Sequence, residues 1–194
     1  VQRSISIESE GDAAFQTLDM GRNVTGFICS HMACTEPTTC HIVFDEILSV
    51  KLEVDFKRLQ CYNIISFRLE PGRYDFQSME LYTLRYATII VTRGQLNISH
   101  FQMKEYANPE TDRAHFKSSD ERINRIFAAG VETFRQNAVD NFLDCPSRER
   151  AGWLCDSYFT ARASLDLCGN TKIEDQFVEN YMLPESFPHL PDGM

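Results

Sequence analysis

The sequence lacks an excess of basic residues and lacks long apolar runs. Of its 194 residues, 19 are lysine or arginine and 28 are aspartate or glutamate, which gives a formal net charge of -9. A protein that binds nucleic acid needs a basic face, so this charge balance argues against that class. No apolar run approaches the roughly 20 residues of a membrane-spanning helix. The hydrophobic fraction of 43% is nevertheless typical of a globular protein with a core.

The start of the sequence does not have the pattern of a signal peptide, and its end reads as cut rather than finished. No initiator methionine opens the chain, and no apolar segment of a signal peptide follows Arg3. We therefore expect a piece of a longer protein. Its compartment stays open, since a bacterial periplasmic, a secreted and a cytoplasmic location all agree with the sequence. Its oligomeric state also stays open.

Seven cysteines are an odd number, so they cannot all pair within one chain. Cys34 and Cys40 flank a turn-like segment, which leaves a hairpin disulfide open. A zinc site is an alternative, because Cys29, His31 and His41 lie close by in the sequence. No Cys-x-x-Cys pair is present, however, and alternate residues of a strand point to opposite faces. We therefore predict no metal and no cofactor.

The first half of the chain has the period-two pattern of strands. From Phe15 to about Met103, apolar, β-branched and aromatic residues alternate with polar ones, and turn signals separate the runs. We expect strands near residues 42–47, 52–56, 62–67 and 86–91. Short strands at this spacing predict an antiparallel β-sandwich domain over residues 1–106.

The second half has helical spacing. Residues 107–118 are polar and contain a proline, which predicts a linker, and residues 119–194 then form a second domain. Ser118 or Ser119 can cap a first helix. Its apolar stripe comprises Ile123, Ile126, Phe127, Val131 and Phe134.

Two further helices are expected. One runs from about Trp153 to Leu167 and stops at a Gly-Asn pair, and the other runs from near Thr171 to before Pro184. In the first helix, Gly130 suggests close packing against another element, because a glycine there costs about 1 kcal/mol relative to alanine.

The most informative segment is residues 144–156, with the sequence DCPSRERAGWLCD. It holds three carboxylates, two guanidinium groups and the only tryptophan of the chain. Pro146 disfavours helix at the preceding residue, so the segment begins as a loop. Glu149, Trp153 and Asp156 share one face if the following helix starts early. Sugar hydrolysis uses a carboxylic acid to protonate the glycosidic oxygen. A capping and ion-pair network would have the same residue types.

This segment resembles the signature of the α-L-rhamnosidases of glycoside hydrolase family 78. The shared residues are Asp144, Cys145, Pro146, Arg148, Glu149, Arg150, Gly152, Trp153 and Asp156. The resemblance continues in residues 18–26, 84–86 and 116–119, in the family's order. One departure is a residue fewer between Arg148 and Glu149.

The resemblance implies a fold and a reaction. The fold would be an antiparallel β-sandwich followed by the first helices of an (α/α)6 barrel. The reaction would be inverting release of terminal α-L-rhamnose from glycosides or polysaccharides. Glu149 would be the general acid, while Asp144 and Asp156 would bind sugar hydroxyls. Arg148 would orient the carboxylates and Trp153 would wall the sugar pocket. The general base would lie downstream, outside this chain, so we expect this piece alone to be inactive.

Two other functions stay open. The shortened spacing before Glu149 is compatible with a related glycosidase that acts on another sugar. The sandwich half alone is compatible with a non-catalytic carbohydrate-binding protein, although the charged loop and the helices would then have no use.

Overall fold

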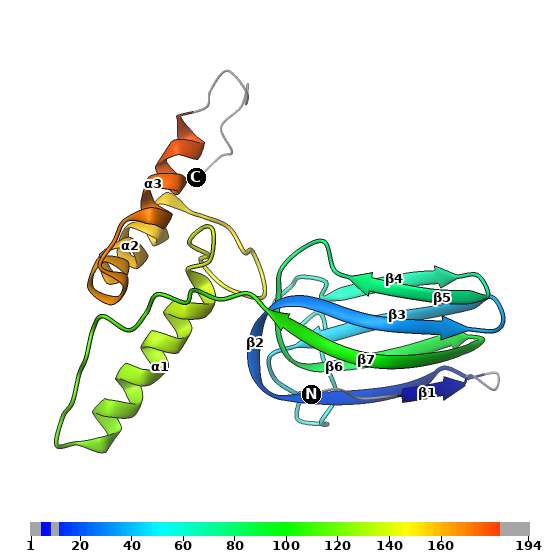
Figure 1. The fold of residues 1–194 in the computed structure, drawn as a ribbon. Coiled ribbons are helices and arrows are strands. Elements are labelled where there is room, and N and C mark those ends of the chain that lie inside the picture. Colours follow the sequence, from blue (N-terminus) through cyan, green and yellow to red (C-terminus); the bar gives the residue numbers. More distant parts are fainter. Residues whose placement is uncertain (1–4, 9–11, 183–194) are drawn as a thin grey trace. The chain divides into compact units, whose positions relative to one another are not determined.

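The computed structural model describes residues 5–8 and 12–182. The chain divides into two compact units, residues 1–105 and residues 106–194 (Figure 1). The first unit holds all of the described strands and the second all of the described helices. The expected order of antiparallel strands followed by helices is therefore confirmed.

The first unit is a seven-stranded antiparallel sheet. The order of the strands is β1-β7-β2-β6-β3-β4, and β5 pairs with β2. Their bounds are β1 Ile5–Glu8, β2 Ala14–Cys34, β3 Thr38–Asp45, β4 Ile64–Leu69, β5 Gly72–Gln77, β6 Tyr82–Arg93 and β7 Gln95–Glu105.

The long strand β2 belongs to both halves of this sheet. Its first part pairs with β6 and its second part pairs with β7 and β5. Between them the register with β6 shifts after Asp19, and Gly21 has a φ of 86°. Asp19 accepts a hydrogen bond from the Gly21 amide (2.7 Å) and a forked pair from Arg85 (2.9 and 3.1 Å). This bulge bends β2, as Figure 1 shows, so one sheet supplies both layers of the sandwich.

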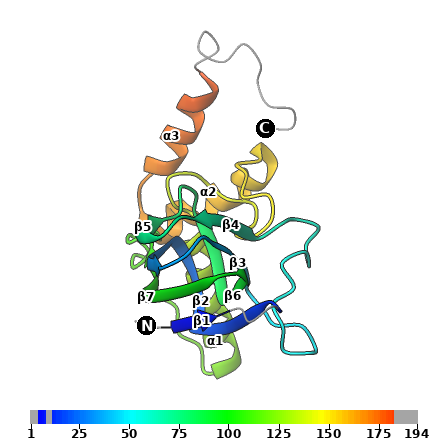
Figure 2. The same cartoon turned by 90° about the vertical axis from the view of Figure 1, so that its right-hand side faces the viewer.

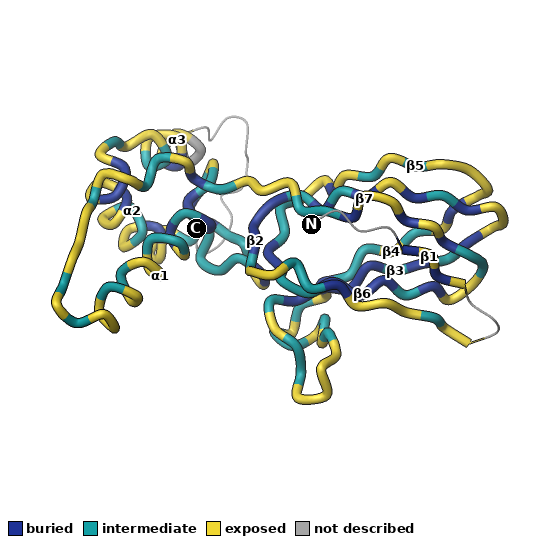
Figure 3. The backbone as a smooth tube through the Cα atoms, turned by 60° about the horizontal axis from the view of Figure 1, so that its bottom comes forward, coloured by how far each residue is buried: buried dark blue, intermediate teal, exposed yellow. Residues whose placement is uncertain are grey.

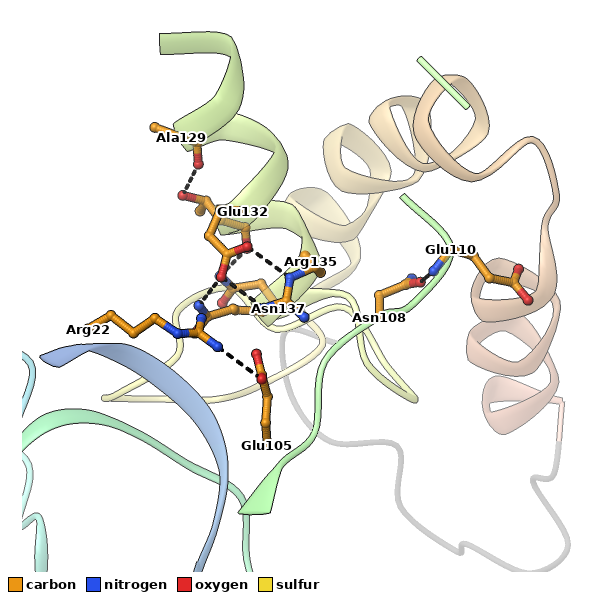
Figure 4. A network of polar contacts seen from close by, with 10 residues as sticks. Arg22, Glu105, Asn108, Glu110, Ala129, Glu132, Arg135 and Asn137 are labelled. Atoms are coloured by element: carbon orange, nitrogen blue, oxygen red, sulfur yellow. Dashed lines mark hydrogen bonds and ion pairs between the residues drawn. The ribbon is translucent and has the colours of Figure 1, made fainter. Parts of the chain in front are cut away.

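Arg22 follows directly after Gly21 and forms an ion pair with the end of β7. Its Nη2 lies 3.0 Å from Oε2 of Glu105 at the end of β7 (Figure 4). Two of the family-like segments, residues 18–26 and 84–86, thus meet at the bend. The residues that these segments share with the family, such as Asp19 and Arg85, hold the bend in β2.

The core lies between the two halves of the bent sheet. Its most buried side chains come from β2, β3, β6 and β7, and include Ile28, Ile42, Leu84, Ile89 and Phe101. The rings of Phe67 on β4 and Phe76 on β5 meet edge to face at 4.9 Å across it. In β1, where buried and exposed residues alternate, the apolar alternation of the sequence corresponds to burial on one face of the strand.

A long connection, residues 46–63, joins β3 to β4 (Figure 2). The strand expected at 52–56 is wrong, because local hydrogen bonds fold this segment into turns. Ser49 Oγ accepts from the amides of Lys51 (3.2 Å) and Glu53 (3.3 Å), and Leu52 has a φ of 61°. Arg58 anchors the connection by donating to both carboxylate oxygens of Asp45, at 2.6 and 2.8 Å.

Cys34 and Cys40 are both buried and both free, so the hairpin disulfide is not formed. Cys34 Sγ donates to the carbonyl of Glu70 (3.0 Å). Burial raises the pKa of the Cys40 thiol to about 11. His31 lies exposed on β2, so the residues considered for zinc are divided between the core and the outer surface.

The second unit contains α1 Glu121–Asn137, α2 Leu154–Cys168 and α3 Lys172–Tyr181. Residues 106–120 form no helix or strand. Asp120 caps α1, with its carboxylate accepting from the Arg122 amide (2.9 Å), so the expected cap at Ser118 or Ser119 is wrong. Gly169 ends α2 with a φ of 67° and donates to the carbonyl of Leu165 (3.0 Å).

The small core of the helical unit consists of Phe134, Ala138, Phe142, Leu167 and Cys168. Figure 3 shows that many other residues of the helical unit are exposed or half-buried. Ile126 of the predicted apolar stripe is 71% exposed. Nothing lies within 4 Å of a Cβ built on Gly130, so close packing there is wrong for this chain. None of the described helices combines the length and apolar character needed to cross a bilayer.

Candidate active-site loop

The charged segment lies in the loop that connects α1 to α2. After α1, an isolated bridge pairs Ala138 with Phe142, and the amide of Leu143 donates to the carbonyl of Asn137 (2.8 Å). Phe142 is 1% exposed, and its ring lies 6.4 Å from that of Phe177 on α3. These contacts fix the start of the loop to the helical core.

Asp144 closes the loop on itself. Its amide donates to the carbonyl of Ala151 (2.9 Å), and its Oδ1 accepts from the Ala151 amide (2.9 Å). The two hydrogen bonds between Asp144 and Ala151 therefore join the ends of the loop formed by residues 145–150. Within it, the amide of Glu149 donates to Cys145 Sγ (3.3 Å), and Arg150 has a φ of 53°. Such backbone angles are costly for residues other than glycine and are frequent at functional sites.

The side chains of Arg148, Glu149 and Trp153 come together at the surface of this loop. Trp153 Nε1 donates to Glu149 Oε2 (2.7 Å), and Arg148 Nη2 lies 2.5 Å from Glu149 Oε1. The side chains of Arg148 and Glu149 are 50% and 38% exposed. Each oxygen of the carboxylate thus has one donor, which fixes its orientation while leaving it accessible to a ligand.

The contact between Glu149 and Trp153 does not arise on a helix face. Trp153 is the N-cap of α2, with an extended backbone (φ -64°, ψ 131°), and the helix begins at Leu154. The prediction that Glu149 and Trp153 share a helical face is therefore wrong. The loop backbone brings them together instead.

Asp156 lies in the first turn of α2, where a negative charge is favourable. It is exposed, and among the described residues its carboxylate has no hydrogen-bond partner. Of the five residues predicted for the site, Glu149 contacts two, Arg148 and Trp153. Asp144 closes the base of the loop, and Asp156 remains free to accept hydrogen bonds from a ligand.

Gly152 is the residue whose role the sequence did not reveal. A Cβ on it would lie 2.5 Å from Asn141 Nδ2 and 2.7 Å from Phe177 Cε2. Any larger residue here, directly before Trp153, would therefore force the Asn141 and Phe177 side chains to shift. Asn141 is eleven residues away and Phe177 twenty-five, so no local pattern could have shown this contact.

A separate cavity of about 320 Å³ in the helical unit contains none of the predicted site residues. It lies beside Asn108, whose side chain accepts from the Glu110 amide (2.8 Å; Figure 4). Lys172 (2.6 Å) and Asn170 (2.7 Å) donate to the Glu110 carboxylate, and they lower its pKa. Burial raises the pKa of the nearby Cys168 thiol. These contacts join the start of the unit to α3 and have no arrangement suited to sugar hydrolysis.

Comparison with known families finds a match in the helical unit. Residues 111–184 match the family described as the bacterial alpha-L-rhamnosidase 6 hairpin glycosidase domain. The whole candidate active-site loop lies inside this match. The resemblance to the bacterial α-L-rhamnosidases is therefore confirmed. No match is found among curated proteins.

Solved structures extend the similarity to most of the chain. A family 78 rhamnosidase of Bacillus sp. GL1 aligns with a TM-score of 0.69 and 23% identity, over 85% of this chain and 17% of that one. A rhamnosidase from Klebsiella oxytoca, with rhamnose bound, aligns with a TM-score of 0.61 and 18% identity, over 88% and 36%. An α-L-rhamnosidase from Dictyoglumus thermophilum aligns with a TM-score of 0.64 and 17% identity, over 91% and 21%.

These alignments show a shared fold. They also show that the chain spans between about a sixth and about a third of the length of these three relatives.

Proposed function

We propose, from the match of residues 111–184 to the rhamnosidase domain, that the protein containing this chain is an inverting glycoside hydrolase. Its substrates are glycosides or polysaccharides with terminal α-L-rhamnose. The chain supplies the sandwich and the first helices of an (α/α)6 barrel. The general base lies in the part of the barrel outside this chain, so the chain alone does not turn over substrate.

The observation that carries this proposal is the contact of Glu149 with Trp153 and Arg148. A general acid must present a carboxyl oxygen to the glycosidic oxygen of the substrate. The half-exposed Glu149 has its orientation fixed by the Trp153 N–H at 2.7 Å. The indole also offers a flat apolar surface beside the carboxylate, against which the apolar side of a sugar ring can pack.

The reaction needs Glu149 to carry a proton and to release it to the leaving group. In the structure, Arg148 pairs with Oε1 and Trp153 donates to Oε2. Each carboxylate oxygen has a second lone pair, so either oxygen can hold the proton while both donors stay in place. The Asp144 Oδ2 atom and the Asp156 carboxylate accept hydrogen bonds from sugar hydroxyls.

The proposal is tested by incubating the full-length protein with p-nitrophenyl α-L-rhamnopyranoside and matched α-L-fucosyl, α-D-mannosyl and β-D-glucosyl compounds. We expect release of nitrophenol from the rhamnoside and appearance of β-L-rhamnose first in the ¹H NMR spectrum, since an inverting enzyme changes the anomeric configuration. Retention of configuration contradicts the inverting mechanism. Preference for another glycoside assigns the site to another sugar.

A further inference from the structure

The outer face of the β unit carries a groove of about 790 Å³. Polar side chains of β2, β5 and β7 line it: His31, Arg73, Asp75, Asn97, Ser99 and His100. None of these residues belongs to the rhamnosidase-like loop, and all of them lie within residues 1–105. The groove is therefore a feature of the β unit alone.

The strand register places these side chains in two rows. His31 lies opposite Asp75 on β5 and opposite Ser99 on β7. Two residues further along β2, Ala33 lies opposite Arg73 and Asn97. The two rows are about 7 Å apart along the strands and cross three neighbouring strands.

The side chains between the two rows point the other way, into the core. Met32 and Ile98 are 3% and 2% exposed. Because successive residues of a strand alternate between faces, the rows together form one outward surface. The small side chains of Ala33 and Ser99 lie at the bottom of the groove, and longer side chains such as His31 and Arg73 line its sides.

The centre of the groove is an ordered arrangement of rings and a carboxylate. His31 Nδ1 is hydrogen-bonded to Asp75 Oδ1, and the His31 and His100 rings meet edge to face at 5.3 Å. His100 has a φ of 61°, at the register shift where β7 has one residue more than β2. Such bulges re-aim side chains, and here the bulge turns an imidazole toward His31.

The chemistry of the groove selects a neutral ligand rich in hydroxyl groups. Arg73 and Asp75 carry opposite charges two residues apart, so neither an anion nor a cation is favoured throughout. The Asn97 amide and the Ser99 hydroxyl both donate and accept hydrogen bonds, which suits sugar hydroxyls. The imidazole rings add flat surfaces.

We propose that this groove is a second carbohydrate-binding site, which holds a neutral saccharide unit on the β unit. The choice of a saccharide among neutral polyols rests on the proposed function. In a glycosidase that acts on polysaccharides, such a site raises the effective concentration of the chain being degraded.

The test is an NMR titration of the ¹⁵N-labelled 194-residue chain with methyl α-L-rhamnopyranoside, with methyl α-D-mannopyranoside and with glycerol. We expect saturable shifts of the His31, Asn97 and Ser99 amides with at least one sugar and none with glycerol. Ser99→Trp fills the floor and should abolish these shifts, and His31→Ala should weaken binding about fivefold, as for the loss of one hydrogen bond.

The matched control is His41→Ala. His41 lies on β3 and also uses its Nδ1 in a partly exposed pair, with Ser66 Oγ at 2.8 Å, but it does not line the groove. This variant should bind as the unchanged chain does. Absence of saturable groove shifts with both sugars, or shifts that persist in Ser99→Trp, would overturn the inference. Shifts of the Glu149 and Trp153 amides report separately on the proposed active site, so the two proposals can fail independently.

Discussion

Replacement of Gly152 by alanine tests the packing of the loop between α1 and α2, the candidate active-site loop. The backbone of Gly152 is not left-handed, so an added Cβ brings no backbone strain and its effect is steric. That Cβ would lie 2.5 Å from Asn141 Nδ2, 2.8 Å from Asn141 Oδ1 and 2.7 Å from Phe177 Cε2. Asn141 cannot move freely, because its Oδ1 accepts from the Phe142 amide at 2.9 Å. Overpacking of this kind costs about 1–3 kcal/mol of unfolding free energy.

Gly130 provides the matched control. It lies inside α1 with nothing within 4 Å of a built Cβ. Gly130→Ala should therefore stabilise the helical unit by up to about 1 kcal/mol through helix propensity alone. The same substitution is thus expected to change the unfolding free energy in opposite directions at Gly152 and at Gly130.

Urea unfolding followed by tryptophan fluorescence measures both effects. Trp153 is the only tryptophan of the chain and lies beside Gly152, so the signal comes from the helical unit. We expect the unfolding midpoint to fall for Gly152→Ala and to rise for Gly130→Ala. A neutral or stabilising Gly152→Ala would refute the packing described for this loop.

Three further outcomes follow from the described contacts. Arg58→Met should lower the unfolding free energy of the β unit by about 3 kcal/mol, because it leaves the buried Asp45 carboxylate without its cation. The double variant with Asp45→Asn removes that charge as well, so an equally large loss in the double variant would contradict this cause. Iodoacetamide at pH 8 should label the exposed Cys155 more than about tenfold faster than Cys40, whose pKa is raised to about 11 by burial; comparable rates by mass spectrometry would show that Cys40 is accessible. The pKa of Glu110 is lower in the folded chain than its ordinary value near 4.5, so its contribution to stability is present above that value and is lost as the pH falls through the lowered one. In Glu110→Gln, the unfolding free energy of the helical unit should therefore fall less steeply as the pH is lowered. An unchanged dependence on pH would show that Glu110 does not cause this loss of stability.

Much of the fold could be predicted where local signals act alone. Alternation gave the strand that contains Ile42 and Phe44, both 1% exposed. A Gly-Asn stop signal gave the end of α2 within a residue. The strand expected around Leu52 was wrong because Ser49 forms turns by hydrogen-bonding the backbone, a competition that apolar spacing does not show.

The candidate active-site loop was only partly predictable. The spacing of Glu149 and Trp153 drew attention to a contact that the structure contains, but the structure forms it across a loop and not on a helix. The closure by Asp144 joins residues seven apart within an irregular loop, which has no repeating pattern in the sequence. The close approach at Gly152 depends on Phe177, which only the fold brings near.

The central claim, that Glu149 is the general acid, is tested most directly in the full-length protein. The measurement is kcat on an alkyl α-L-rhamnoside, which needs protonation of its leaving group, for the unchanged enzyme and for Glu149→Gln. We predict a loss of ~10²-fold or more on the alkyl rhamnoside and a much smaller loss on a p-nitrophenyl rhamnoside, whose leaving group needs little protonation. Equal rates of Glu149→Gln and the unchanged enzyme on the alkyl rhamnoside would contradict the assignment.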